Sequence, residues 1–420
     1  MKMKKLWTVI LVMTLMLSFV VAGQVFAGSV YAGKDTKMTF GDDVSFLKRY
    51  MDTVVLSDST GKGKVCVIPA LQGRVMTSSA DGDKGAGYGW INYEHFKARK
   101  LTPHINAYGG EDRFWLGPEG GQFSIYFAKD VPFKFENWFT PECLDTEAYD
   151  VVKKSGNSVT VKKDIKLANY SGVGMRLSVE REVSVLEAAD AFKLLGVQDD
   201  SSLGMVAYQS SNKIKNTGKA AWNKETGMLS VWILGMYNPS PATTVVIPYN
   251  TGAEAALGAV VKDNYFGKVP ADRLVVKEKA MFFSCDGKCR SKIGLNPKRA
   301  KAVLGSYDAL NKVLTIVQYN KPEGGSDYVN SAWELQKEPF KGDVVNSYND
   351  GPNDEGKVMG PFYELESSSP AAALKPGESL MHIHRTVHFT GPEVSLDKVA
   401  RSVLGESLEE IRNGLKNDVH

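Results

Sequence analysis

The chain has 420 residues, of which 43% are hydrophobic, 51 are Lys or Arg and 48 are Asp or Glu. Three of the basic residues stand within the first five positions, so the remainder of the chain is formally neutral. A neutral chain without a long basic run argues against nucleic acid and against an anionic membrane surface as partners. The hydrophobic content is sufficient for a large core.

The N-terminus has the pattern of a secretory signal peptide. Three lysines precede an apolar run over residues 6–21, and Val25 and Ala27 provide small residues for cleavage. The apolar run is short for a membrane span, and no cysteine precedes Cys66 to carry a lipid. We therefore expect residues 1–27 to be removed, leaving no membrane anchor, and the mature protein to be periplasmic or secreted in a bacterium.

In chain order, a short helix is expected over 43–50, capped by Asp43. From there the signals are almost all strand: alternating or β-branched runs separated by turn residues. The expected strands are 65–70, 73–77, 151–155, 158–163, 174–183, 230–235, 243–248, 274–277, 313–319 and 379–389. Only the end of the chain, over 393–401 and 407–414, has a helical pattern.

Many short strands without intervening helices indicate stacked antiparallel sheets. No repeat of fixed period and no Pro- or Ser-rich linker divides the chain. The sequence therefore predicts a mainly β protein with one large domain over residues 28–420 and a short helical C-terminus.

The segment from His104 to Gln122 is rich in polar, aromatic and glycine residues and follows neither a helical nor a strand period. Glycines permit tight turns and a close approach to a ligand, while carboxylates, a guanidinium and planar rings suit a hydroxyl-rich ligand. The candidate substrate-binding residues are His104, Asn106, Glu111, Asp112, Arg113, Trp115, Glu119 and Gln122. The alternative is a structural loop whose charges pair with one another.

Two glutamates stand close together on a late strand. Strand alternation places Glu364 and Glu366 on the same face as Phe362, with Tyr363 and Leu365 opposite. Adjacent carboxylates repel unless a cation or a shared proton separates them, which raises one pKa and suits a general acid or base. The alternative is a solvated edge strand.

Three of the six histidines also share one strand face, namely His382, His384 and His388. His-x-His spacing is found in metal sites, but imidazoles also shuttle protons or donate hydrogen bonds, and we assign no metal. Cys285 and Cys289 are expected to form a disulfide or to remain two free thiols rather than to bind zinc. Signatures of serine hydrolases, phosphate-binding loops and zinc proteases are absent from the sequence, and no cofactor is expected.

Three segments together resemble the galactose-mutarotase-like (aldose-epimerase-like) supersandwich proteins, and in particular an uncharacterised secreted bacterial family. They are Ser210–Gly218, which resembles a sheet-edge "N-x-G" signature; Tyr108–Pro118, which resembles a "GG-x-x-x-W-x-x-P" segment; and Phe362–Glu366 followed by the "L-x-P-G-E" turn at Leu374. The resemblance implies an antiparallel β-supersandwich.

In that family a glutamate on the late strand acts as base on the anomeric hydroxyl and a histidine acts as acid toward the ring oxygen. By position the resemblance assigns the base to Glu366 or Glu364. The family's mid-chain histidine has no counterpart here, which leaves His104, His382 or His384 as the acid.

The expected function is that of a carbohydrate-handling protein with a sugar or glycan ligand. One version is a cofactor-independent acid–base enzyme of epimerase or mutarotase type, and the other is a non-catalytic glycan-binding module on the same fold. We expect the 104–122 segment, the glutamate strand and the histidine strand to converge on one cleft. Arg113 would then contact a glutamate or a substrate oxygen, and Trp115 would stack on a sugar.

Overall fold

The computed structural model describes residues 38–416 apart from 324–326 and 354. The chain from Met38 onward clusters as one compact unit. The expected signal peptide over 1–27 lies outside the described residues. Within the described part of the chain, no helix combines the length and the apolar character needed to cross a membrane.

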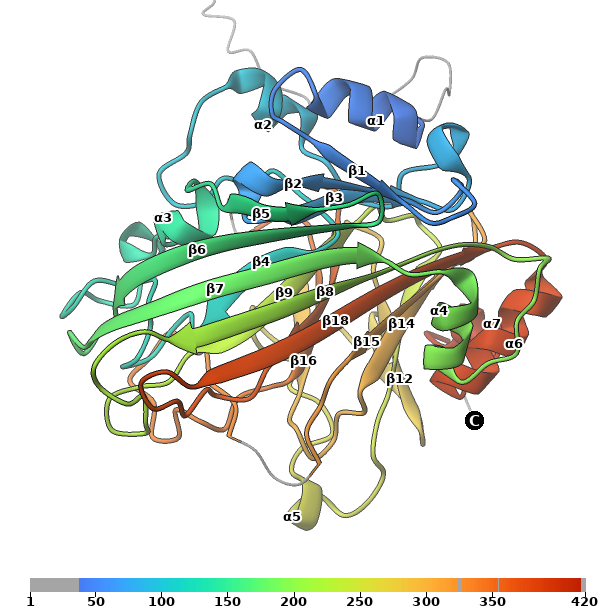
Figure 1. Cartoon of the computed structure of the whole chain (residues 1–420). Helices are drawn as coiled ribbons and strands as arrows, with labels where there is room; N and C mark the ends of the chain where they lie inside the picture. The colour runs from blue at the N-terminus through green and yellow to red at the C-terminus, as the bar shows by residue number, and fades with distance from the viewer. Residues whose placement is uncertain (1–37, 324–326, 354, 417–420) are drawn as a thin grey trace, which may run out of the picture. The chain divides into compact units, whose positions relative to one another are not determined.

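Three antiparallel sheets build this unit (Figure 1). The three-stranded sheet contains β1 (Val54–Ser57), β2 (Lys64–Ile68) and β3 (Arg74–Ser79). The five-stranded sheet runs β13 (Ser291–Leu295), β16 (Val345–Asn349), β17 (Tyr363–Ser368), β9 (Ser230–Tyr237) and β4 (Arg113–Gly117). The ten-stranded sheet runs β11 (Leu274–Val276), β12 (Ala280–Ser284), β10 (Thr243–Pro248), β14 (Val303–Asp308), β15 (Val313–Tyr319), β18 (Ser379–Thr390), β8 (Gly204–Asn216), β7 (Gly174–Val185), β6 (Ser158–Ala168) and β5 (Asp150–Lys154).

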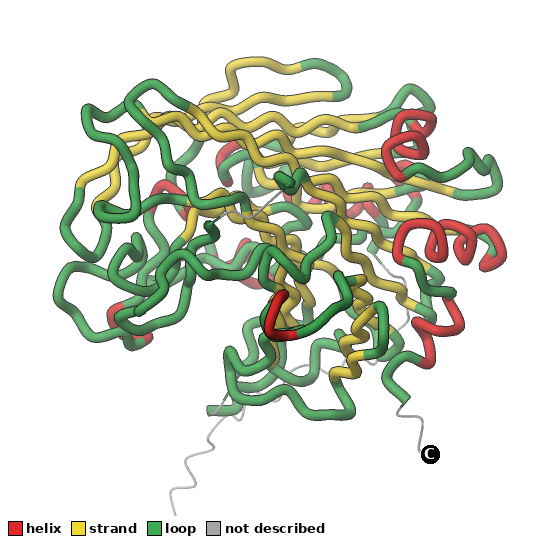
Figure 2. The backbone as a smooth tube through the Cα atoms, turned by 90° about the horizontal axis from the view of Figure 1, so that it is seen from below, coloured by secondary structure: helices red, strands yellow, loops and turns green. Residues whose placement is uncertain are grey.

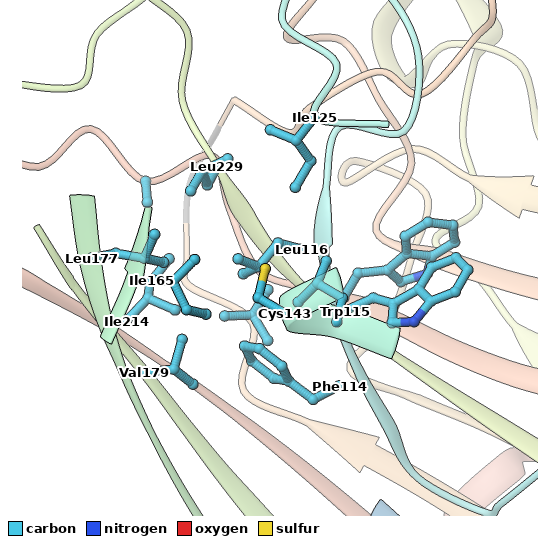
Figure 3. Packing of buried hydrophobic residues seen from close by; sticks show 14 of the residues in the cluster. Phe114, Trp115, Leu116, Ile125, Cys143, Ile165, Leu177, Val179, Ile214 and Leu229 are labelled. Atoms are coloured by element: carbon cyan, nitrogen blue, oxygen red, sulfur yellow. The ribbon is translucent and has the colours of Figure 1, made fainter. Parts of the chain in front are cut away.

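The main core lies between the five-stranded and ten-stranded sheets. Because side chains alternate along a strand, Phe114 and Leu116 of β4 point toward Leu177 of β7 and Ile214 of β8, whereas Trp115 points to the other side (Figure 3). Apolar residues of β9, β13, β16 and β17 continue this layer against β10, β12, β14 and β15. One face of the five-stranded sheet is thus committed to the core.

Helices occupy the margins of the sheets (Figure 2). They are α1 (Phe40–Leu47), α2 (Tyr93–Ala98), α3 (Glu142–Asp145), α4 (Ala188–Leu195), α5 (Glu254–Leu257), α6 (Glu393–Leu404) and α7 (Leu408–Asn413). Residues of α4, α6 and α7 pack with the other face of the ten-stranded sheet, and α1 packs with the three-stranded sheet. The helices therefore leave the outer face of the five-stranded sheet to loops.

The predicted antiparallel β fold with a short helical C-terminus is confirmed. The hairpin of β2 and β3, the turn between β5 and β6, and helices α6 and α7 stand where the sequence placed them. The first helix differs: it begins at Phe40, because Thr39 and Asp42 form a capping box. β8, which carries the expected sheet-edge signature, instead pairs with β18 and β7 inside the ten-stranded sheet. Cys285 and Cys289 are separate free thiols.

Candidate functional site

The outer face of the five-stranded sheet carries a compact group of charged and aromatic side chains. Every strand except β16 contributes to it: Arg113 and Trp115 come from β4, Trp232 from β9, Glu364 and Glu366 from β17, and Lys292 from β13. We call these six residues the outer-face cluster.

A glycine turn delivers the β4 members. Gly109 and Gly110 have φ values of 92° and 114°, which favour glycine. A Cβ atom on Gly110 would lie 2.8 Å from the carbonyl oxygen of Val75, so the backbone approach itself excludes a side chain. Beyond this turn, Asp112 faces the sheet interface and Arg113 faces outward, because neighbouring residues point to opposite sides.

Glu366 is the most enclosed carboxylate of the outer-face cluster. Its side chain is fully buried, and the Lys292 ammonium lies 2.9 Å from one of its oxygens. The indole N–H of Trp232 donates to the other oxygen at 2.8 Å. Burial lowers the pKa of Lys292, but the nearby glutamates, above all Glu366, raise it by more, so that its net pKa lies above the usual value. The geometry therefore places a cation and an indole N–H beside the two oxygens of Glu366.

Glu364 lies next to it under a different balance of charges. Arg113 donates to Glu364 at 2.7 Å, and the Arg113 guanidinium also lies 4.8 Å from the centre of the Trp115 ring. Burial raises the pKa of Glu364 to about 8, with the charge of Glu366 adding to the rise, and Arg113 and Lys292 oppose it. The raised pKa predicted for one of two neighbouring carboxyls is found at Glu364, although burial is its largest cause. The cations beside the two carboxyls are Arg113 and Lys292.

A third carboxyl, Glu119, reaches the same region from the loop after β4. Its side chain is half-buried, and burial raises its pKa to about 7, opposed by Lys292 and reinforced by Glu366. The indoles of Trp333 and Trp138 act on it in the lowering direction. The N–H of Trp138 is buried, and its geometry toward Glu119 falls short of a full hydrogen bond. It is a donor that lies beside the Glu119 carboxyl.

The histidine strand lies on the opposite side of β17. The Ser367 hydroxyl is 2.8 Å from His382 Nε2 and 2.8 Å from His384 Nδ1. Because Ser367 follows Glu366, its side chain points between the two sheets while Glu366 points outward. Burial, and then the His384 ring, lower the pKa of His382 to about 3. Burial lowers the pKa of His384 to about 4.

Two acidic residues of the 104–122 segment also lie at this interface. Asp112 and Arg181 form an ion pair of 2.6 Å in which both side chains have zero exposure. Glu111 accepts hydrogen bonds from the Ser78 hydroxyl and the Tyr208 hydroxyl at 2.8 and 3.0 Å, and lies 3.1 Å from His388 Nε2. Asp112 is therefore paired with Arg181, and Glu111 is hydrogen-bonded inside the core.

The remaining residues of the segment hold loops. Asn106 is buried and donates to Asp145 at 2.7 Å. Gln122 exchanges two hydrogen bonds of 2.9 Å with the backbone of Gln336. His104 Nδ1 lies 2.7 Å from the Trp138 carbonyl oxygen.

The expected convergence therefore holds for part of the set. Arg113, Trp115 and Glu119 meet the glutamate strand, whereas the histidine strand, Glu111 and Asp112 face the sheet interface. Sequence reasoning did not single out Lys292, Trp232 or Trp333. For Lys292 a signal existed: it stands in Ser291–Leu295, where Ile293 and Leu295 alternate inward and Lys292 must point outward.

Across the described ranges, no group of three or more His, Cys, Asp or Glu is arranged to hold a metal ion. A hollow of about 380 Å³ lies beside the cluster, lined by Lys262, Asp343 and neighbouring residues. Asp343 accepts a hydrogen bond from Tyr265, whose hydroxyl is 3.0 Å from the Asn346 amide. Another hollow, of about 420 Å³, lies around Lys224 and Asp327.

A family model described as "Family of unknown function (DUF6786)" matches residues 38–415. The chain belongs to this family. A search of curated proteins found no match in sequence.

Solved structures similar to this one include three bacterial proteins. They are a galactose mutarotase-like protein from Lactobacillus casei ATCC 334 (10% identity, TM-score 0.46, covering 80% of this chain and 100% of that one), a galactose mutarotase related enzyme from Lactobacillus acidophilus (9%, 0.41, 81% and 98%), and the Slr1438 protein from Synechocystis sp. PCC 6803 (10%, 0.47, 81% and 96%). The resemblance expected from the three sequence segments is found again among these structures, while the fold itself rests on the strand pairing described above.

Proposed function

We propose that this protein handles carbohydrate at the outer-face cluster and catalyses a cofactor-independent acid–base reaction on a sugar ring. One observation carries the proposal: the Lys292 ammonium lies 2.9 Å from Glu366, while burial brings the pKa of the nearby Glu119 to about 7. Two carboxyl groups in different surroundings, one beside a cation and one whose pKa burial raises, can supply a base and an acid.

In the proposed reaction Glu366 removes the proton of the anomeric hydroxyl, and the protonated Glu119 delivers a proton to the ring oxygen. The C–O bond of the ring opens, the carbonyl group rotates, and ring closure returns both protons. Trp115, Trp138 and Trp232 are buried beside these carboxyls, and the proposal requires that a sugar ring reach and pack against them.

A second candidate function is a non-catalytic glycan-binding module. It is favoured by the fact that Glu366 and Glu364 are already engaged by Lys292, Trp232 and Arg113. A carboxylate that is already paired with a cation is a weaker base.

Polarimetric mutarotation assays on a panel of α-anomers, with calorimetric binding of the same sugars, test the proposal. Glu366→Gln and Glu119→Gln should each lower kcat by roughly 10²–10⁴-fold, which is the contribution of a positioned acid or base. Glu142→Gln, an exposed carboxyl on α3, is the matched control and should retain activity. Binding without turnover would favour the second candidate, and neither binding nor turnover would overturn both.

A further inference from the structure

Exposed aromatic side chains continue the wall of the candidate site to the surface. Phe135, Phe139 and Trp333 expose 56%, 45% and 37% of their surface. Within the described part of the chain, the only other Phe or Trp among the exposed large hydrophobic side chains is Phe266. Because exposed apolar rings are costly in water, a local group of them marks a binding surface.

These rings form an ordered series. Trp333 and Trp138 have centroids 6.1 Å apart with planes inclined by 23°, and Trp138 and Phe135 are 6.0 Å apart at 19°. The His104 ring then lies 4.5 Å from Phe135 and 4.5 Å from Phe139, at 38° and 27°. We call these five residues the aromatic belt.

The aromatic belt begins at the acid–base pair. Both Trp333 and Trp138 act on the Glu119 carboxyl, and Trp138 lies 6.5 Å from Trp115 in the outer-face cluster. The belt is therefore continuous with the proposed site and extends beyond the space that one sugar ring against Glu119 requires.

The charges around the aromatic belt are balanced. Lys134 and Glu136 flank Phe135, and Glu334 and Lys337 follow Trp333, all with exposed side chains. A surface without excess positive charge has no preference for a polyanion. Flat rings bounded by balanced charges suit the apolar C–H faces of uncharged sugar units.

We propose that the substrate is the terminal unit of a neutral oligosaccharide, and that the aromatic belt holds its second and later units. This inference rests on the proposed function, since it needs a sugar at Glu119 and Glu366. The terminal unit occupies the outer-face cluster, and the chain leaves past Trp333 toward Phe135 and Phe139.

The test measures affinity and turnover as a function of chain length. The probes are glucose and galactose with the neutral di-, tri- and tetrasaccharides of the malto-, cello- and β-1,4-galacto series. Wild type is compared with the double variant Phe135→Ser/Phe139→Ser, with Glu119→Gln, and with Phe266→Ser as a matched exposed aromatic outside the belt. Circular dichroism checks that each variant is folded. Because the substituted rings are exposed, their loss should not unfold the protein.

In one of the series, affinity should rise roughly tenfold for each unit added from one to three. The double variant should lose this rise while its monosaccharide affinity stays unchanged, and Phe266→Ser should match wild type. Affinity that does not depend on chain length would overturn the proposed role of the aromatic belt. So would a double variant that loses as much affinity for monosaccharides as for oligosaccharides.

The two proposals fail in different ways. In one outcome, binding is independent of chain length while monosaccharides are turned over and Glu119→Gln abolishes that turnover. This result would support the proposed function and overturn the role of the aromatic belt. Length-dependent binding without turnover would support the belt and overturn the acid–base reaction. If sedimentation finds a dimer that the double variant dissociates, a second copy of the chain covers the belt, and the inference is overturned.

Discussion

The two faces of β17 carry similar residue types in different surroundings. On the inner face, Ser367 joins His382 and His384, and the nearby Asp112–Arg181 pair has zero exposure on both side chains. On the outer face, the Arg113–Glu364 pair retains 5% and 7% exposure, and Lys292 retains 13% beside Glu366. Both faces hold buried charges or imidazoles with hydrogen-bond partners.

Access, rather than residue type, separates the two faces. The inner groups are enclosed by the sandwich, where Ser367 contacts both His382 and His384. The outer cluster continues into exposed rings through Trp138 and Trp333, and Glu119 stays half-buried beside it. Acids, bases and imidazoles in a sequence therefore identify candidates, and the path to solvent decides which of them can meet a substrate.

The inner face should show the largest effect on stability. Asp112→Asn leaves the Arg181 guanidinium buried without its carboxylate, which should lower the free energy of unfolding by about 3–5 kcal/mol in urea titrations. The control is Asp327→Asn, whose partner Lys224 is well exposed and whose loss should cost less than about 1 kcal/mol. Equal effects of the two substitutions would contradict the comparison.

The inner histidines should also make the fold sensitive to acid. Because the pKa values of His382 and His384 fall to about 3 and about 4 in the folded chain, the unfolded chain binds protons first as the pH drops. Their stabilising contribution is present above about pH 6.5 and is lost as the pH falls through the folded values.

The double variant His382→Asn/His384→Asn tests this pH dependence directly. Between pH 6.5 and pH 4, the free energy of unfolding should fall less steeply than in wild type, by about 1.4 kcal/mol per pH unit for each histidine removed. Urea titrations at a series of pH values measure this slope. An unchanged slope would show that these rings do not titrate as the geometry implies.

A smaller effect is expected where a loop holds the outer face in place. Gln122→Ala removes both hydrogen bonds to Gln336, three residues beyond Trp333, and should cost about 1 kcal/mol. Hydrogen exchange at the Gln336 amide should become faster. Gln209→Ala, whose amide contacts Ser211 on the ten-stranded sheet, is the control and should leave that exchange unchanged.

Alternation along single strands was readable from the sequence, and pairing between distant strands was not. The shared face of Glu364 and Glu366 and the shared face of the histidines follow from a period of two residues. Which face of the histidine strand is buried depends on the pairing of β18 with β8 and β15. The contact of Lys292 with Glu366 joins residues that are 74 positions apart in the chain and lie on either side of β16. Trp333 lies in a loop, where no periodic pattern marks it.

A pH-dependent effect of the opposite sign distinguishes Glu119 from the inner histidines. Its pKa is raised from 4.5 to about 7 chiefly by burial, so the folded chain keeps a proton that the unfolded chain has lost. The stability that accompanies this proton is present below pH 4.5 and is lost as the pH rises through about 7. Glu119→Gln has no such proton, so the melting temperature of the variant, relative to that of wild type, should be about 4 °C higher at pH 8 than at pH 4. Scanning calorimetry at both pH values measures this. A difference of the same size at both pH values would show that Glu119 keeps its ordinary pKa. The acid of the proposed reaction would then have to be Glu364, a carboxyl of the outer-face cluster whose pKa burial also raises.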